Sequence, residues 1–126
     1  MMDVWIFGNP DLLEDSLPLR LFNKLKKAFP HVRFVFQDPL DEWDLPEKII
    51  MVDTVKGIDA VSEFTSLEQF QAAPHVTMHD FDLGAQLAFL QKVGKLPKFV
   101  LIGVPDTLSE DRALEQVSAM LRRYVP

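Results

Sequence analysis

Residues 4–36 read VWIFGNPDLLEDSLPLRLFNKLKKAFPHVRFVF and contain the pattern that decides the fold. The apolar run Val4–Phe7 leads into Gly8-Asn9-Pro10, which is typical of a buried strand that ends in a loop. Residues 17–29 then repeat apolar side chains along one helical stripe, which predicts an amphipathic helix. Residues 32–36 are mostly β-branched or aromatic and predict a second strand. This order of strand, helix and strand indicates an α/β protein.

The rest of the chain continues the alternation. The expected elements are, in order, a loop with one helical turn over 38–47, a strand over 49–52, the segment 59–70, an extended approach over 75–79, a helix over 81–93, a strand over 98–104 and a helix from Thr107. The apolar residues of 59–70 are consistent with either a strand followed by a turn or a short helix, and an extended strand near a sheet edge is favoured. The helix over 81–93 is expected to bury Leu83, Leu87, Leu90 and Val93, and Thr107 and Glu110 have the spacing of a capping box. We therefore expect one domain over residues 1–126. Its fold is expected to be a three-layer sandwich with a mostly parallel central sheet of about five strands and helices on both faces.

Composition removes several classes of function. The chain has no cysteine, which excludes a cysteine nucleophile, an iron–sulfur cluster and a zinc ribbon. Its formal charge of -6 repels phosphate backbones and anionic membranes, so we expect no nucleic-acid partner and favour a partner that carries a cation. The longest apolar runs fall far below the roughly 20 residues that span a bilayer. The first residues lack the features of a secretory signal, and we expect a cytoplasmic protein.

Acids and a histidine follow three of the apolar segments. Glu14 and Asp15 lie after the first strand, Asp53 ends the strand over 49–52, and His79 precedes the helix over 81–93. Ligands of open α/β sheets bind beyond the carboxyl ends of the strands, where these residues are expected to meet. Two carboxylates and an imidazole have the composition of an open divalent metal site, with positions left for ligands from a partner.

Each residue also has a purely structural interpretation. Asp15 or Ser16 has the residue type and position of an N-cap for the helix over 17–29. Asp53 is equally a turn residue that accepts backbone N–H groups, and His79 is equally the first turn of a helix. A third ambiguity concerns three aromatic residues that form either an exposed recognition patch or ordinary packing: Trp43, Phe64 and Phe70.

Four motifs in order resemble the hydrogenase maturation proteases, endopeptidases that trim the C-terminal extension from the large subunit of nickel-iron hydrogenases. The motifs are Gly8 to Asp15, Ile50 to Asp53, His79 followed by Leu83-Gly84, and Ile102 to Pro105. The resemblance covers nearly the whole chain. It implies an aspartyl-endopeptidase-like hydrolase that processes the precursor of such a large subunit.

The resemblance also implies roles for the acids and the histidine. Asp15, Asp53 and His79 fall on the residues that contact nickel already installed in the precursor. The nickel therefore comes with the substrate, and we expect no tightly bound cofactor of the protein itself. Asp15 or Asp53 is a candidate general base toward water, and Glu14 is a spare acid.

The chain departs from the family pattern at two places. Ser16-Leu17-Pro18 stand where a glycine-containing stretch is usual, and Thr54-Val55-Lys56 separate Asp53 from Gly57. These departures motivate the alternative that the protein is a noncatalytic module, which recognises a metalloprotein without cleaving it. A third hypothesis is a small-molecule binding protein with an enclosed apolar pocket. A monomer is favoured over an oligomer.

Overall fold

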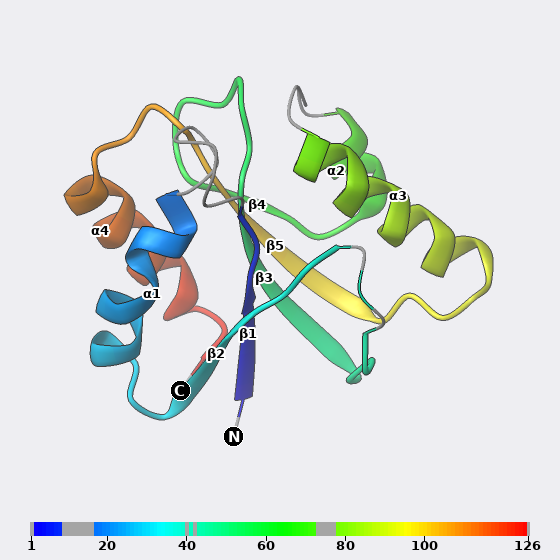
Figure 1. Cartoon of the computed structure of the whole chain (residues 1–126), viewed down its shortest axis with the longest axis horizontal. Coiled ribbons are helices and arrows are strands. Elements are labelled where there is room, and N and C mark those ends of the chain that lie inside the picture. The colour runs from blue at the N-terminus through cyan, green and yellow to red at the C-terminus, as the bar shows by residue number, and fades with distance from the viewer. Residues whose placement is uncertain (1, 9–16, 40, 42, 73–77, 126) are drawn as a thin grey trace.

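The computed structural model of the chain describes residues 2–8, 17–39, 41, 43–72 and 78–125, with residues 78–82 described by their backbone alone. Its elements are, in order, β1 (Met2–Ile6), α1 (Leu17–Ala28), β2 (Val32–Phe36), β3 (Lys48–Thr54), β4 (Ser62–Phe64), α2 (Leu67–Ala72), α3 (Met78–Lys92), β5 (Lys98–Val104) and α4 (Glu110–Leu121). The strands form one central layer between two pairs of helices (Figure 1). The expected α/β sandwich is confirmed.

The sheet has five strands in the order β2-β1-β3-β5-β4. The first four are parallel, and only β4 runs antiparallel, along the outer side of β5. β3 is central, and all seven of its residues pair in register with β5, from Lys48 opposite Lys98 to Thr54 opposite Val104. The mostly parallel sheet matches the prediction from the alternating strands and helices.

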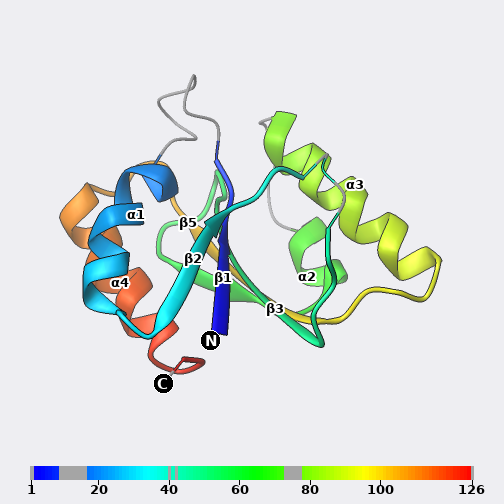
Figure 2. The same cartoon turned by 60° about the horizontal axis from the view of Figure 1, so that its bottom comes forward.

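Side chains on β3 point alternately to the two faces of the sheet, and this alternation divides the core. Ile50 and Val52 belong to the cluster covered by α1 and α4. Ile49 and Met51 belong to the cluster covered by α2 and α3. Figure 2 shows the two helix pairs on opposite sides of the strands. Because both faces are covered, the strands of the centre read as continuous apolar runs in the sequence.

Several predicted elements differ in detail from the structure. The segment 59–70 contains the short edge strand β4 followed by α2, because its apolar residues serve two elements. No helical turn is seen among the described residues of 38–47. Ser109 rather than Thr107 caps α4, since the Ser109 side chain accepts a hydrogen bond from the backbone N–H of Arg112. None of the described helices combines the length and apolar character needed to cross a membrane.

Helix α3 corrects two further predictions. It begins at Met78, so His79 lies in its first turn and is not part of an extended approach. It ends at Lys92, and the following turn has Gly94 at a φ of 75°, where the missing side chain removes the usual strain. Val93 therefore lies past the helix and is 46% exposed, whereas Leu83, Leu87 and Leu90 are buried as expected.

Candidate functional site

The order in which the chain adds strands to the sheet reverses at β1. The chain leaves β1 through α1 to reach β2 on one side, while β3 pairs on the other side and leads on to β5. In open α/β sheets ligands bind beyond the carboxyl ends of the strands at such a switch point, which here lies between β1 and β3. The first turns of α1 and α3 lie at this same end of the molecule (Figures 1 and 2).

Asp53 lies at the carboxyl end of β3 and is completely buried. By strand alternation it shares the face of Met51, which is the face covered by α2 and α3. Its Oδ1 accepts a hydrogen bond of 2.9 Å from the backbone N–H of Thr54. A buried carboxyl group is costly unless hydrogen bonds compensate for its lost hydration, and the N–H of Thr54 supplies one such partner beside the switch point. The bond to a backbone N–H agrees with the structural interpretation, although Asp53 lies within a strand and not in a turn.

Gly103 stands opposite Asp53 in the β3–β5 register. A Cβ at this position would lie 2.8 Å from Cε2 of Phe64 and 2.9 Å from Cγ2 of Val55. The bare backbone of Gly103 therefore allows these two side chains to pack over the sheet beside Asp53. A glycine inside an apolar strand is the sequence signal that indicates such a close approach.

Thr54 follows Asp53 and points to the opposite face of the sheet. The residue is completely buried, and its Oγ1 makes no hydrogen bond with the described part of the chain. Buried hydroxyl groups without a partner are rare, because the group loses its hydration without compensation. The sequence analysis noted Thr54 only as part of the departure between Asp53 and Gly57 and gave it no role, since a threonine at the end of a strand is common.

His79 lies at the same end of the molecule but belongs to a helix and not to a strand. It lies in the first turn of α3, which covers the Asp53 face and starts near the carboxyl ends of the strands (Figures 1 and 2). Only the backbone of this turn is described. The helix therefore brings the backbone of His79 to the end of the sheet where Asp53 lies.

Glu14 and Asp15 lie outside the described residues. The described residues that flank them are Gly8, after β1, and Leu17, at the start of α1. The end of β1 and the start of α1 both lie at the carboxyl end of the sheet (Figure 1). In the side chains that are described, no three His, Asp or Glu residues are close enough to hold a metal ion. That set leaves out Glu14, Asp15 and the His79 side chain, so the predicted ligand set stays a prediction.

The three ambiguous aromatic residues are divided between packing and surface. Phe64 and Phe70 are buried and lie with ring centroids 6.1 Å apart. Trp43 is half-buried, and its ring centroid lies 5.2 Å from that of Trp5 and 5.8 Å from that of Phe7. Packing therefore explains Phe64 and Phe70, while Trp43 has both a packed edge and a surface edge.

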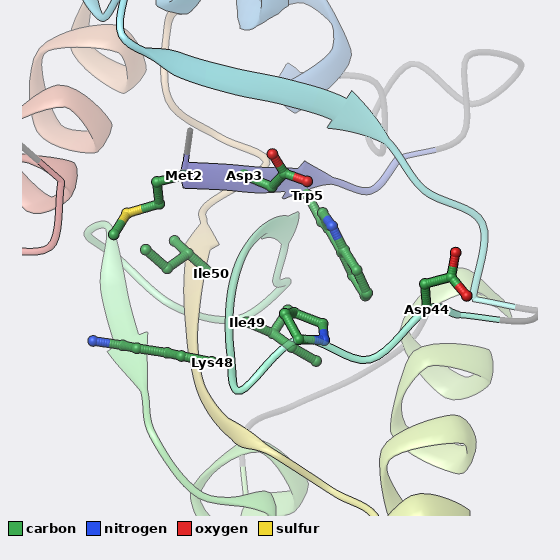
Figure 3. Close-up of a pocket in the computed structure, with 8 residues that line it drawn as sticks. Met2, Asp3, Trp5, Asp44, Lys48, Ile49 and Ile50 are labelled. Carbon is green, nitrogen blue, oxygen red and sulfur yellow. The ribbon is translucent and has the colours of Figure 1, made fainter.

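A cavity of about 460 Å³ lies at the other end of the sheet, at the amino ends of β1 and β3 (Figure 3). Trp5 and Ile49 supply apolar walls, while Asp3, Asp44 and Lys48 add charged groups. Asp3 is paired with Arg33, whose hydrogen bonds and positive charge hold the pKa of the Asp3 carboxyl below its ordinary value. Because this cavity opens at the opposite end from Asp53, it is not part of the candidate site.

Comparison with known proteins supports the fold. No protein-family model and no curated protein sequence matches the chain. Among solved structures it is similar to the hydrogenase maturating endopeptidase HybD from E. coli, with 20% identity, a TM-score of 0.65, and coverage of 98% of this chain and 93% of that one. It is also similar to the [NiFe] hydrogenase maturation protease HycI from Thermococcus kodakarensis KOD1, with 16% identity, a TM-score of 0.56, and coverage of 97% and 90%.

A third similar structure is described as a Hydrogenase 3 maturation protease, with 17% identity, a TM-score of 0.61, and coverage of 94% of this chain and 88% of that one. At such identities the likeness establishes the fold. The chain therefore has the fold of these maturation proteases over almost its whole length, and the resemblance noted in its motifs extends to its three-dimensional structure.

Proposed function

We propose that this chain, which has the fold of the hydrogenase maturation proteases, is itself a processing endopeptidase. Its substrate is the precursor of a nickel-iron hydrogenase large subunit, from which it removes the C-terminal extension after nickel insertion. The observation that carries the proposal is the position of Asp53, buried at the carboxyl end of β3 beside the switch point, in a fold that matches HybD over 98% of the chain.

The proposed nickel contacts are Asp15, Asp53 and His79. The described elements support this set, because the carboxyl ends of β1 and β3 and the first turn of α3 all lie at the same end of the sheet (Figure 1). Carboxylate oxygens and an imidazole nitrogen leave open positions for thiolate ligands from the substrate, and nickel accepts all three ligand types. The metal belongs to the substrate and reports that its insertion is complete.

Cleavage needs a base that activates water. Asp15 or Asp53 is the proposed general base, and Glu14 takes this role where Asp15 is engaged with nickel. A metal-bound carboxylate is a weaker base, because the cation neutralises part of its charge. One acid is therefore proposed to contact nickel while another accepts the proton from water.

The test is the intact mass of a purified precursor after incubation with this protein. We expect the nickel-loaded precursor to lose a C-terminal peptide and the nickel-free precursor to keep its mass. Asp15→Ala, Asp53→Asn and His79→Ala are each expected to lower the rate of processing by at least about 100-fold, because each removes a proposed nickel contact and the two acids are also candidate general bases. Circular dichroism checks that each variant is folded.

Two matched substitutions control for general effects. His31→Ala removes an exposed histidine that lies between α1 and β2, and Asp59→Asn removes an exposed acid in the chain between β3 and β4. Both are expected to process at the wild-type rate. Binding of the precursor without any change of mass would instead favour the noncatalytic recognition module, and the absence of both binding and cleavage would refute the assigned partner.

The source of the metal has a separate test. Because the nickel is proposed to arrive with the substrate, we expect the isolated protein to contain far less than one equivalent of nickel or zinc after purification. Inductively coupled plasma mass spectrometry of the purified protein measures this content directly. One tightly held equivalent of either metal would contradict the proposal that the metal is carried by the substrate.

A further inference from the structure

One edge of the central sheet is open on the side of β1. β2 is the first strand in the order β2-β1-β3-β5-β4, and no described segment pairs with its outer side (Figure 2). The strand at the other edge, β4, has only three residues, whereas β2 has five. An unpaired strand edge is a template on which another extended chain can add as a further strand.

The backbone of β2 turns alternate residues toward this open edge. Gln37 follows the strand, and its N–H donates a hydrogen bond of 3.0 Å to the backbone oxygen of Ile6 in β1. Because backbone groups alternate in direction along a strand, Phe34 and Phe36 direct their N–H and C=O groups away from β1. These donors and acceptors match the main chain of an extended peptide, which binds other proteins by adding to such an edge.

An aromatic pair lies at the carboxyl end of the same strand. The rings of Phe36 and Phe22, from α1, are stacked with their centroids 4.1 Å apart, yet Phe36 is 55% exposed. Nζ of Lys26 lies 5.2 Å from the centre of the Phe22 ring. An aromatic side chain that is already packed loses little conformational freedom on binding, and such residues dominate the energy of many interfaces. The pair therefore offers an ordered surface to an apolar side chain of an added strand.

The open edge is continuous with the candidate site. Phe36 is opposite Ile6 in the β1–β2 register, and both strands end there, at the carboxyl end of the sheet. β1 alone separates β2 from β3, which carries Asp53. Neighbouring strands lie about 4.8 Å apart, so a strand added to β2 lies about 14 Å from β3. An extended chain covers this distance in about four residues.

We propose that this edge binds the C-terminal extension of the precursor as an added strand. The inference rests on the proposed processing function, because that function supplies the peptide. The extension follows the cleaved bond, so it reaches the edge beside Phe36 and runs toward Val32, antiparallel to β2. About four residues after the cleaved bond span the distance to the edge. The residues that follow them pair with the backbone of Phe36 and Phe34, and an apolar side chain among them packs on the aromatic pair.

Processing kinetics with the nickel-loaded precursor test the aromatic end of the edge. Phe36→Asp places a charge beside the bound segment. We expect this variant to raise KM at least about 10-fold while kcat stays within about two-fold of the wild-type value. Phe89→Asp is the matched control, because Phe89 is similarly exposed at 58% but lies on α3, and it should leave both constants unchanged.

A shortened substrate tests whether Phe36 acts through the extension. The short precursor keeps only about the first four residues after the cleaved bond, so it lacks the segment proposed to pair with β2. We expect the wild type to cleave it with a KM raised at least about 10-fold. On this precursor the KM of Phe36→Asp should lie within about two-fold of the wild-type value, because the two changes remove the same contact.

Hydrogen exchange tests the backbone pairing without a substitution and without cleavage. The probe is a synthetic peptide with the sequence of the extension, added to the wild-type protein at a saturating concentration. We expect exchange of the Phe34 and Phe36 N–H groups, followed by NMR, to slow at least about 10-fold. Exchange of the N–H groups of β4, at the other edge, should not change.

The outcomes separate this inference from the proposed function. Cleavage of the full precursor with the same KM by the wild type and Phe36→Asp overturns binding at this edge and leaves the processing function standing. Unchanged exchange at Phe34 and Phe36 has the same meaning, as does an equal rise of KM in the variant on the full and short precursors. A full precursor that is neither bound nor cleaved refutes the proposed function and, with it, the occupant assigned to the edge.

Discussion

Thr54 is the residue at which burial and hydrogen bonding conflict most clearly in the described part of the chain. Its hydroxyl is buried at the end of β3 and makes no hydrogen bond with the described residues. The hydroxyl thus loses water without gaining a partner, while its methyl group adds to the core between the sheet and the α1 and α4 layer. The conflict lies one residue from Asp53, at the proposed site.

We expect Thr54→Val to increase the free energy of unfolding by about 1 kcal/mol. Valine has nearly the same shape and removes the unpaired hydroxyl, whose burial costs on the order of 1–3 kcal/mol. Urea denaturation measures the change. Thr65→Val is the control, because the Thr65 hydroxyl donates to Oε1 of Gln69 at 3.2 Å and its removal should not stabilise the protein. A less stable Thr54→Val variant would show that the hydroxyl has a favourable interaction.

Two glycines on the α2 and α3 side should respond differently to the same substitution. Gly103→Ala places a methyl group within 3 Å of Phe64 and Val55, and we expect it to lower the unfolding free energy by about 1–3 kcal/mol. Gly84→Ala meets only an ordinary contact of 3.4 Å with Phe70 and gains helix propensity, so it should leave stability unchanged or raise it. Thermal denaturation of the two variants compares them directly, and equal losses would contradict this account of Gly103.

At the scale of elements, an ion pair links the two parallel strands at one end of β1. Asp3 and Arg33 are opposite each other in the β1–β2 register, and Nε and Nη2 of Arg33 donate to the two carboxylate oxygens at 2.9 and 2.6 Å. The hydrogen bonds from Arg33, followed by its charge, lower the pKa of Asp3 below the ordinary 3.8. The ionised form of Asp3 is therefore favoured in the folded protein.

This shift predicts a pH dependence with a definite sign. The pair stabilises the fold at pH values above 3.8, and this contribution is lost as the pH falls through the lower pKa of the folded state. Because both groups are partly exposed, Asp3→Asn should cost at most about 1 kcal/mol near neutral pH. Urea denaturation of the wild type, Asp3→Asn, Arg33→Gln and the double variant measures the coupling. A coupling that does not weaken in acid would contradict the assignment.

At the scale of the whole molecule, one sheet supports two separate apolar clusters. Leu121 belongs to the α1 and α4 cluster, whereas both tryptophans lie at or against the α2 and α3 cluster. The clusters share every central strand, so loss of packing on one face should propagate to the other. We therefore expect the described elements to unfold together.

Leu121→Ala tests this cooperativity, because Leu121 and the two tryptophans lie on opposite faces of the sheet. The substitution removes a completely buried side chain and should lower the free energy of unfolding by about 2–5 kcal/mol. Tryptophan fluorescence, which reports on Trp5 and Trp43, should shift its urea midpoint by the same amount as far-ultraviolet circular dichroism. Separate midpoints for the two signals would show that the faces unfold independently.

The sequence by itself determined the kinds of element and most of their positions. Continuous apolar runs identified β3 and β5, and the helical stripe of α1 predicted its buried Leu21 and Leu25. Both signals are readable because the spacing of apolar residues is a local property of the sequence. The same runs placed Asp53 at the end of a strand. Prediction was weakest where one short segment serves two elements, as it does in β4 and α2.

Only the tertiary structure decided which ends and faces meet. The strand order puts the switch point between β1 and β3, and α3 brings the backbone of His79 to that end of the sheet. The tertiary structure also leaves Val93 exposed, although its spacing from Leu83, Leu87 and Leu90 in the sequence matches the buried face of the helix. The physical reason is that a hydrophobic pattern specifies a buried side of an element, whereas the partner that covers this side is chosen by contacts between residues far apart in the chain.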